Sequence, residues 1–327
     1  MKKILEVQKI RGGYETPYGF VRAVDGCSLV AYEGEILGIA GESGCGKSTF
    51  AHLIIGYVKP PLKVLEGTSI IDNTDIYKLS WTERRTKVWG RLVSVIPQYS
   101  MNSLNPTKRI KDLVLDVIRE KYRTPPPKDK IIEMARVRFE ELGLSDKVLD
   151  MYPIELSGGM KQRAVIAIST LLNPKLLIAD EPTSALDVST QKRLLQLLYN
   201  LVRRKNIVRT LIMISHDIAT LRQICDRMCI MYAGKIVELA STEDIINYPL
   251  HPYTKGLINS VVSVEPSLRK KVLKGIPGAP PNLINPPPGC RFHPRCPNAL
   301  PICYKKEPPL VEINERRYVA CWLYAET

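Results

Sequence analysis

Residues 36–56, ILGIAGESGCGKSTFAHLIIG, decide the fold of this chain. An apolar run at 36–40 leads into the glycine-rich segment GESGCGKS at 41–48, and an apolar pattern of helical period follows. A strand, a glycine-rich loop and a helix in this order are typical of a phosphate-binding loop. Glycines let the backbone N–H groups of such a loop point toward phosphate oxygens, and the N-terminus of the next helix favours an anion. The stretch therefore predicts a nucleoside triphosphate site.

The two residues that close this loop carry most of its expected chemistry. The Lys47 ammonium can reach the β- and γ-phosphates, and the Ser48 hydroxyl can bind Mg²⁺. An ordinary glycine-rich turn is the structural alternative, and the strand and helix on either side disfavour it. The loop residues that we expect to contact the nucleotide are Gly41, Ser43, Gly44, Cys45, Gly46, Lys47, Ser48 and Thr49.

The segment before the loop, residues 1–35, has the pattern of short β-strands joined by turns. A strand-rich segment in this place can put an aromatic ring over the adenine. Tyr14 and Tyr18 are the two candidates. Each is equally well explained as an exposed turn tyrosine, so both interpretations stay open.

Three further apolar runs each end in polar side chains: LVSVIP (92–97) before Gln98, LLIA (176–179) before Asp180 and Glu181, and TLIMIS (210–215) before His216. Uninterrupted apolar strands that alternate with helical patterns predict a parallel sheet buried on both faces. Ligands of open α/β sheets bind beyond the carboxyl ends of the strands. We therefore expect these side chains to converge on one nucleotide.

Each of these polar residues suits a role in nucleotide hydrolysis. Asp180 suits Mg²⁺ ligation beside Ser48, and Gln98 can join the same Mg²⁺ shell. Glu181 is placed to orient or deprotonate the attacking water, and His216 can hold that water or the γ-phosphate. Taken singly, Gln98 and His216 are more often structural residues, and the combination with the loop favours the catalytic reading.

Length and composition set limits on the class of protein. The 327 residues, 45% of them hydrophobic, suit one large domain with an extension, or two domains. The apolar runs fall short of a membrane span and no signal peptide is visible, so we expect a cytosolic protein. The formal net charge of +14 permits a nucleic-acid or membrane partner. However, the basic runs at 203–205 and 269–271 are short and carry no interleaved aromatics, which favours a solvated surface.

The last forty residues hold four of the eight cysteines, in the pattern Cys290-x5-Cys296-x6-Cys303-x17-Cys321. They follow a connector at 275–289 that is rich in proline. We expect little core in so small a tail, and four thiolates suit a metal site that would hold it together. From spacing alone zinc is at least as good a candidate as an iron–sulfur cluster, although the short Cys pairs of most zinc sites are absent. Four unliganded thiols are the third possibility.

Taken together, these motifs resemble those of the ATP-binding cassette (ABC) ATPases, and the resemblance covers essentially the whole chain. The matching segments are GESGCGKS (Walker A), LLIADE with its catalytic Glu181 (Walker B), LSGGM at 156–160 (signature), Gln98 (Q-loop), SALD at 184–187 with Asp187 (D-loop) and His216 (switch histidine). The resemblance implies a P-loop NTPase (RecA-like) core with a parallel sheet. An N-terminal antiparallel β subdomain, a helical signature subdomain and a small cysteine-rich C-terminal extension complete the implied α/β fold.

The same resemblance implies ATP and Mg²⁺ as ligands and a head-to-tail dimer. In that dimer Ser157, Gly158 and Gly159 act on the nucleotide of the partner, and the nucleotide-contacting set includes Asp180 and Asp187. The implied domains are a nucleotide-binding domain at 1–240, with its helical subdomain at about 105–165, and an extension at 241–327 with its cysteine module at 290–321.

Two further stretches, SLNP (103–106) and HPYT (251–254), and the cysteine tail are similar to the oligopeptide/dipeptide importer branch of the family. This branch implies an energy-coupling ATPase at the cytoplasmic face of the membrane. Its partners are a second, distinct ATPase, two permease subunits and an extracytoplasmic binding protein, with no nucleic acid. It also implies a four-iron four-sulfur cluster at the four tail cysteines, with zinc as the alternative.

Other readings remain open at this point. Peptide is the first cargo expected, with oligosaccharide or nickel as alternatives, and a homodimer is an alternative to the heterodimer. A soluble cassette ATPase acting on nucleic acid or ribosomes is the less favoured function. The chain departs from the family pattern at Met160, which stands in place of a glutamine, and at Tyr99, where the branch usually has an aspartate.

Overall fold

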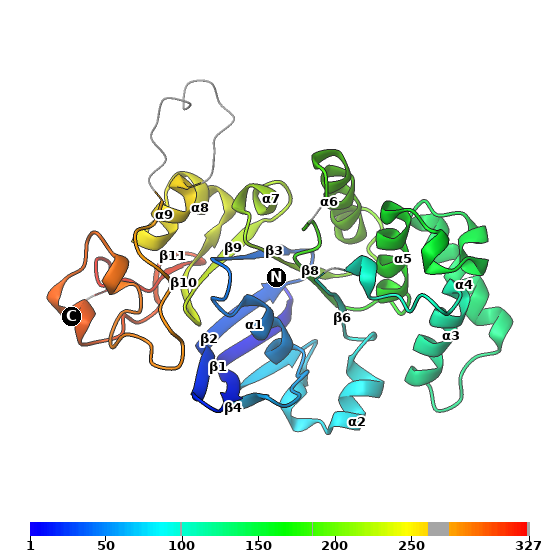
Figure 1. Ribbon diagram of the computed structural model, residues 1–327, viewed down its shortest axis with the longest axis horizontal. Helices are drawn as coiled ribbons and strands as arrows, with labels where there is room; N and C mark the ends of the chain where they lie inside the picture. Colours follow the sequence, from blue (N-terminus) through cyan, green and yellow to red (C-terminus); the bar gives the residue numbers. More distant parts are fainter. Residues whose placement is uncertain (99, 185, 261–274, 326–327) are drawn as a thin grey trace. The chain divides into compact units, whose positions relative to one another are not determined.

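The computed structural model describes residues 1–98, 100–184, 186–260 and 275–325 (Figure 1). The chain divides into two compact units, each assembled from segments far apart in the sequence. The helical unit comprises Met1–Leu5, Ala31–Glu35 and Ile70–Ile212, and the phosphate-loop unit comprises Glu6–Val30, Ile36–Ser69 and Met213–Thr327. Tyr99, Ala185 of the D-loop and the basic run at 269–271 lie outside the described residues.

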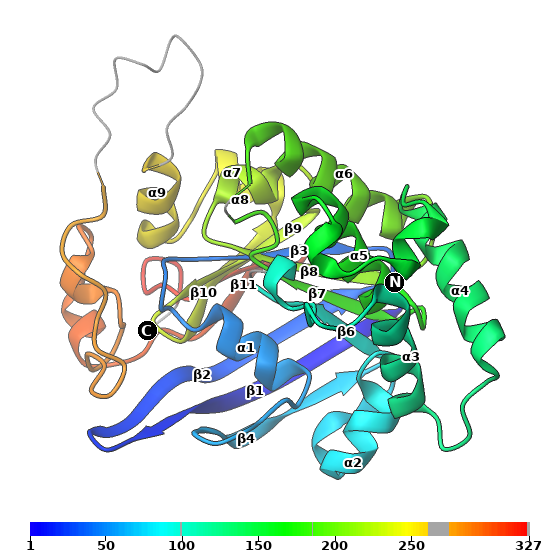
Figure 2. The same ribbon diagram turned by 45° about the vertical axis from the view of Figure 1, so that its right-hand side comes forward.

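Two long strands, β1 (Lys3–Thr16) and β2 (Gly19–Tyr32), form a hairpin that lies largely in the phosphate-loop unit. Only two residues link these strands and they are neighbours in the sheet, so they run antiparallel. The strand β4 (Leu62–Ile71) lies on the other side of β1 (Figure 2). The predicted antiparallel N-terminal subdomain is thereby confirmed.

The phosphate loop follows the short strand β3 (Ile36–Ala40), which pairs in parallel with β9 (Arg227–Tyr232). Every residue of both strands is buried. Burial on both faces explains why the sequence of β3 is continuously apolar instead of alternating. The helices of this unit are α1 (Lys47–Ile54), α7 (Ile218–Arg222), α8 (Thr242–Asn247) and α9 (Pro252–Asn259).

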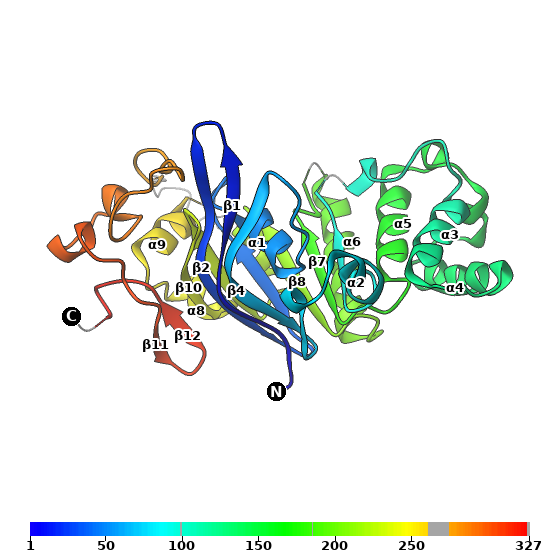
Figure 3. The same ribbon diagram turned by 90° about the horizontal axis from the view of Figure 1, so that it is seen from below.

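The C-terminal tail adds strands to the sheet of the phosphate-loop unit. The strand β10 (Lys235–Ser241) runs antiparallel to β9, and β12 (Arg317–Val319) pairs with β10 through the register Glu238↔Val319. A second tail strand, β11 (Val311–Asn314), pairs with β12 (Figure 3). The tail is therefore part of this sheet as well as the carrier of the cysteines.

The tail also shares a core with the rest of its unit. Phe292 is 2% exposed, and its ring centroid lies 5.1 Å from that of Tyr232 and 5.4 Å from that of Tyr253. Tyr232 ends β9 and Tyr253 belongs to α9, so the tail packs on an aromatic cluster built by two other elements. The expectation that the tail has little core is therefore wrong.

In the helical unit, β6 (Val93–Ile96) and β7 (Leu176–Asp180) pair in parallel, from Val93↔Leu176 to Ile96↔Ala179. The two-residue strand β5 (Thr74–Asp75) pairs with the last residues of β4. The fully buried strand β8 (Thr210–Ser215) begins in the helical unit and ends in the phosphate-loop unit. The predicted parallel pairing of apolar strands is thus confirmed within each unit.

The helices of the helical unit are α2 (Trp81–Glu83), α3 (Ile110–Lys121), α4 (Lys128–Glu141), α5 (Gly158–Thr170) and α6 (Val188–Arg203). The triple proline at 125–127 separates α3 from α4, because proline disfavours the interior of a helix. The helices α3, α4 and α5 pack together (Figure 3). Across the described ranges, no helix is both long enough and apolar enough to span a membrane.

Candidate nucleotide site

The phosphate loop at 41–48 has a backbone that only glycine fits at two positions. Gly41 has a φ of 155°, and a Cβ atom there would lie 2.2 Å from the carbonyl oxygen of Met231. Gly46 has a φ of 107°, and a Cβ atom there would lie 2.0 Å from the carbonyl oxygen of Ala23. These close approaches explain the spacing of the two glycines, because the loop passes directly against neighbouring backbone.

The Lys47 side chain is enclosed by this loop. Lys47 is 5% exposed, and its ammonium donates hydrogen bonds to the carbonyl oxygens of Gly41 at 2.8 Å and Glu42 at 3.0 Å. A phosphate oxygen is a stronger acceptor than a carbonyl, so the same ammonium is positioned to bind a phosphate. Burial raises the pKa of the nearby Cys45 thiol, which keeps that thiol protonated and unreactive.

The two tyrosine candidates for the base have different surroundings. The Tyr14 hydroxyl lies 3.0 Å from the Thr49 hydroxyl, so this half-buried tyrosine of β1 reaches the first turn of α1. Tyr18 lies in the turn between β1 and β2 and is 87% exposed. Base stacking stays a prediction for both, and the contact with Thr49 makes Tyr14 the better placed.

Two of the predicted catalytic-site residues of the helical unit, Asp180 and Glu181, lie at the end of β7. Asp180 is the last residue of this strand and is 8% exposed. The next residue, Glu181, has a φ of 46°, which is uncommon for a residue with a side chain and is typical of functional positions. The Gln98 amide donates to the Glu181 carboxylate at 3.4 Å, and the Ser184 hydroxyl donates to the Glu181 carbonyl oxygen at 2.9 Å. The structure thus brings together two of the predicted catalytic residues.

The signature segment forms the exposed start of α5. The Ser157 hydroxyl caps this helix by accepting the N–H of Met160 at 3.4 Å, and Gly158 and Gly159 are its first two residues. A Cβ atom at Gly159 would meet nothing within 4 Å, so the start of the helix is open on that side. An open helix N-terminus of this kind attracts anions.

One residue of α5 that the sequence analysis missed connects the signature helix with the catalytic segment. Gln162 is 4% exposed and donates to the carbonyl oxygen of Pro182 at 2.8 Å. Pro182 directly follows Glu181, so a buried hydrogen bond joins the two motifs. In the sequence Gln162 stands between Lys161 and Arg163, so nothing in its neighbourhood marks it as the buried one.

Asp187 has a structural role of its own. Its carboxylate accepts the N–H groups of Ser189 and Thr190, both at 3.0 Å, and so caps α6. These hydrogen bonds hold the pKa of Asp187 well below its usual range. Its predicted contact with nucleotide stays a prediction.

The other residues that were predicted to converge on the nucleotide are divided between the two units. His216 follows β8 and is exposed, and it belongs to the phosphate-loop unit together with Ser43, Gly44 and Ser48. Gln98 and Asp180, the other predicted Mg²⁺ ligands, belong to the helical unit. Their common site with Ser48 therefore stays a prediction, as do the domain boundaries inferred from the sequence.

The four tail cysteines interact with one another. The pKa of Cys290 is raised to about 12, chiefly by burial and to a smaller extent by the neighbouring thiols of Cys303, Cys321 and Cys296. The N–H of Cys290 also donates to the carbonyl oxygen of Cys303 at 2.8 Å. Yet in the described part of the chain no three His, Cys, Asp or Glu side chains are placed to hold a metal ion. The predicted metal site is therefore not found, although the fold gathers its four thiols in one region.

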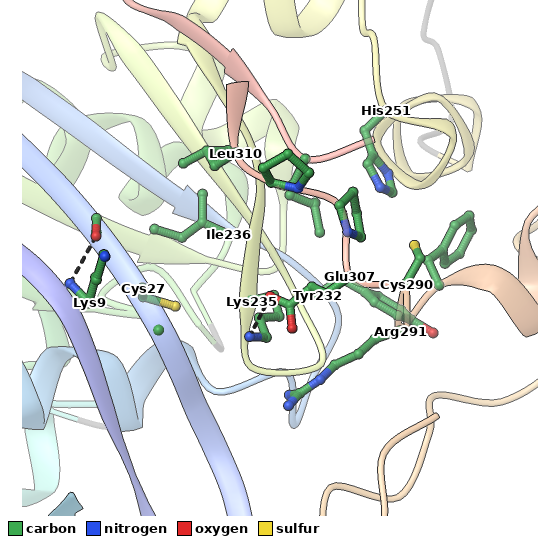
Figure 4. A pocket seen from close by; sticks show the side chains of 17 residues that line it. Lys9, Cys27, Tyr232, Lys235, Ile236, His251, Cys290, Arg291, Glu307 and Leu310 are labelled. Atoms are coloured by element: carbon green, nitrogen blue, oxygen red, sulfur yellow. Dashed lines mark hydrogen bonds and ion pairs between the residues drawn. The ribbon is translucent and has the colours of Figure 1, made fainter. Parts of the chain in front are cut away.

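A cavity of about 360 Å³ lies between β2, the β9–β10 hairpin and the tail (Figure 4). The Lys235 ammonium in its wall pairs with Glu307 at 2.6 Å and with Asp25 at 3.4 Å. Arg291, also in the wall, pairs with the same Asp25. These charged groups satisfy one another, so the cavity marks where the tail is fastened and is not the nucleotide site.

Comparisons with known proteins agree with this geometry. Residues 24–184 match the family described as ABC transporter, and residues 237–303 match the family described as Oligopeptide/dipeptide transporter, C-terminal region. The Dipeptide transport ATP-binding protein DppD of Caldanaerobacter subterraneus subsp. tengcongensis is 40% identical over 100% of this chain and 98% of its own length. The Oligopeptide transport ATP-binding protein OppF of Salmonella typhimurium is 38% identical over 98% of this chain and 93% of its own.

A solved structure extends the agreement to the fold. The dimeric ATP-binding cassette MJ0796, in a post-hydrolysis state bound to ADP and Pi, is 27% identical in sequence. It superposes with a TM-score of 0.63 over 73% of this chain and 98% of its own. The predicted P-loop NTPase fold of an ABC cassette is therefore confirmed.

Proposed function

The chain belongs to the ABC transporter ATP-binding proteins of the dipeptide/oligopeptide type, and from this premise we propose that it energises the import of peptides. Members of this family are ATPases that drive transport, and this chain is one of them. The observation that carries the peptide assignment is the match of both parts of the chain, since the dipeptide relative is similar from the cassette to the end of the tail.

The described residues support a division of labour in ATP hydrolysis. The N–H groups of the loop and the Lys47 ammonium bind the phosphates, and Tyr14 lies against α1 near the same loop. Bound Mg²⁺ supplies positive charge to the phosphates, and the hydroxyl, carboxylate and amide oxygens of Ser48, Asp180 and Gln98 are the hard ligands that suit it.

We assign the activation of water to the end of β7. Glu181 orients the attacking water and accepts its proton. The amide of Gln98, at 3.4 Å from that carboxylate, holds it in orientation. His216 contributes a second polar contact to the water or the γ-phosphate.

The function needs a second ATPase and a membrane partner. The open start of α5 at Ser157 and Gly158 suits an anion that the chain itself does not supply, such as the nucleotide of a second cassette. We propose a distinct second ATPase, two permeases and a substrate-binding protein as the partners, at the cytoplasmic face of the membrane. Hydrolysis then resets a closed pair of ATPases that nucleotide binding favours.

A gentle affinity purification of the tagged chain from detergent-solubilised native membranes tests this assembly. Mass spectrometry should identify two polytopic permeases and a second ATPase, and recovery of this chain as the sole ATPase would replace the heterodimer with a homodimer. A co-purified binding protein can be screened with peptides, oligosaccharides and nickel, and binding of only the latter two would overturn the peptide assignment. Recovery only with ribosomes or nucleic acid in the soluble fraction would overturn the transport function.

For the tail we propose that Cys290, Cys296, Cys303 and Cys321 hold a four-iron four-sulfur cluster. Support comes from the mutual interaction of the four thiols and from a donor set of four cysteines. The thiols of a cluster are spread around its irons, so they need not be as close as the ligands of one ion. A brown anaerobic preparation containing iron and acid-labile sulfide is expected. A preparation with one zinc per chain and no sulfide would show a zinc site in place of the cluster. A preparation with neither zinc nor a cluster would show four free thiols.

A further inference from the structure

A single residue of the phosphate loop, Glu42, is held through all of its polar groups. Its N–H donates to the Tyr253 hydroxyl at 2.9 Å, and its carbonyl oxygen accepts the Lys47 ammonium at 3.0 Å. Its two carboxylate oxygens each accept one nitrogen of Arg295, at 2.8 Å and 3.0 Å. Two of these three partners belong to the C-terminal part of the chain, outside the loop motif.

Arg295 is rigidly placed for this contact. Its side chain is 6% exposed, and its Nε donates to the carbonyl oxygen of Pro277 at 2.7 Å. Its guanidinium also lies over the Tyr232 ring, 5.7 Å from the ring centroid. It comes directly before Cys296, so the cysteine module presents it. A forked arginine–carboxylate pair of this kind combines geometric specificity with strong hydrogen bonds.

We propose that Arg295 is a positioning residue of the nucleotide site, which sets the affinity for ATP by neutralising the Glu42 carboxylate. The loop binds a polyanion, and an unpaired carboxylate in the same loop would repel it, most strongly in a partly buried site of low dielectric. Arg295 cancels that charge from outside the motif. The cysteine module is thus part of the ATP site through this arginine, whether or not its thiols carry a metal.

A double-mutant cycle distinguishes this electrostatic role from simple anchoring of the tail. Arg295→Gln leaves the Glu42 carboxylate unpaired and should raise the Kd and the KM for ATP about tenfold, with kcat nearly unchanged. In Glu42→Gln with Arg295→Gln the repelling charge is gone, so the affinity should return to within about threefold of the wild type. The defect of Arg295→Gln should also shrink as salt rises, because salt screens the repulsion.

Arg291→Gln is the matched control. Arg291 belongs to the same module and lies in the wall of the cavity (Figure 4). Both arginines are 7% exposed, but Arg291 pairs with Asp25 instead of Glu42. The Arg291→Gln variant should have a lower thermal stability and an unchanged Kd for ATP. Equal losses of affinity in Arg291→Gln and Arg295→Gln, or a double variant as weak as Arg295→Gln, would overturn the proposal in favour of anchoring.

Glu42→Gln alone keeps the proposal testable if Arg295→Gln does not fold. It leaves an uncompensated positive charge beside the loop, so ATP should bind about as tightly as in the wild type or more tightly at low salt. Weaker binding in a folded Glu42→Gln would contradict the proposal. All of these measurements use ATP and the purified full-length chain, so their outcome is independent of the cargo and of the membrane partners.

Discussion

The phosphate loop and the cysteine tail both belong to the phosphate-loop unit, but their main cationic side chains find partners at very different distances along the chain. Lys47 is bound by carbonyl oxygens only five and six residues earlier in the chain. The tail is fastened by Arg295 to Glu42, 253 residues away, and by Arg291 to Asp25, 266 residues away. A structure fixed by its own local sequence can be read from that sequence, and a structure fixed by distant partners cannot.

The largest effect is expected outside both regions, at Glu181 of the helical unit, the proposed catalytic carboxylate. Glu181→Gln removes the proton acceptor and should lower the turnover of ATP about 10²–10⁴-fold, while binding of ATP is kept. Steady-state hydrolysis and equilibrium ATP binding measured on the same preparation check this. Unchanged turnover would show that another residue activates the water.

In the tail, Arg291→Gln should lower the free energy of unfolding. Arg291 is 6% exposed on its side chain, and its loss removes one ion pair of Asp25 and a donor to the carbonyl oxygen of Ala233. Because Arg11 and Lys235 still pair with Asp25, we expect a loss of about 2 kcal/mol, less than for a fully buried pair left without a partner. Chemical denaturation measures it, and an unchanged midpoint would mean that the Arg291–Asp25 pair does not help to fasten the tail.

In the loop, Lys47→Ala should instead lower the affinity for ATP. Loss of a charged hydrogen-bond donor to phosphate should weaken ATP binding about 10- to 100-fold. Lys63→Ala is the control, since Lys63 is 53% exposed in a surface pair with Glu15 and such pairs contribute little. If Lys47→Ala bound ATP like the wild type, the loop would not be the phosphate site. If it mainly unfolded the unit, the contrast between loop and tail would be lost.

At neutral pH the smallest effect is expected at His251, whose contribution to stability changes only in acid. Burial lowers the pKa of His251 to about 3, with a further contribution from Lys255, and its neutral Nδ1 accepts the N–H of Tyr253 at 3.0 Å. At pH values between these two pKa values, the histidine of the unfolded chain, with an ordinary pKa near 6.5, therefore binds a proton while His251 of the folded chain stays neutral. The contribution of His251 to the free energy of unfolding is therefore complete above about pH 6.5. Below that pH it falls by about 1.4 kcal/mol per pH unit, until the pKa of the folded state is reached.

His251→Asn separates this contribution from other acid effects. Asparagine can cap α9 in the same place, since it is a good N-cap residue, and it does not titrate. The difference in unfolding free energy between wild type and variant should therefore change between about pH 6.5 and 4.5 and stay constant above it. A difference that is independent of pH would show that His251 is protonated equally in the folded and the unfolded chain.

The sequence was informative where chemistry is local. The strand, loop and helix of residues 36–56 and the apolar strand that ends in Asp180 were predicted, because each is visible in the pattern of neighbouring residues. The open question of Tyr14 or Tyr18 reflects the same limit, since a tyrosine near a turn gives no sign of whether its hydroxyl reaches α1. The structure distinguishes them through the contact with Thr49.

The tail shows what such local patterns leave out. The spacing of its cysteines predicted a metal-held segment with little core, whereas Phe292 packs on Tyr232 and Tyr253 and β12 joins β10. Arg295 and Glu42 looked like ordinary polar residues, because a pair 253 residues apart has no signature in the sequence of either partner. HPYT was recognised only as a family marker, and its tyrosine proved to hold the N–H of Glu42.

The central claim is that hydrolysis of ATP by this chain drives the import of peptide, and uptake tests it most directly. The complex purified with the chain is placed in vesicles with its binding protein and ATP, and the uptake of a labelled dipeptide and a labelled oligopeptide is measured for the wild type and Glu181→Gln. We predict uptake with the wild type and none with the variant. No peptide uptake by an ATP-hydrolysing complex, or equal uptake by both proteins, would contradict the account.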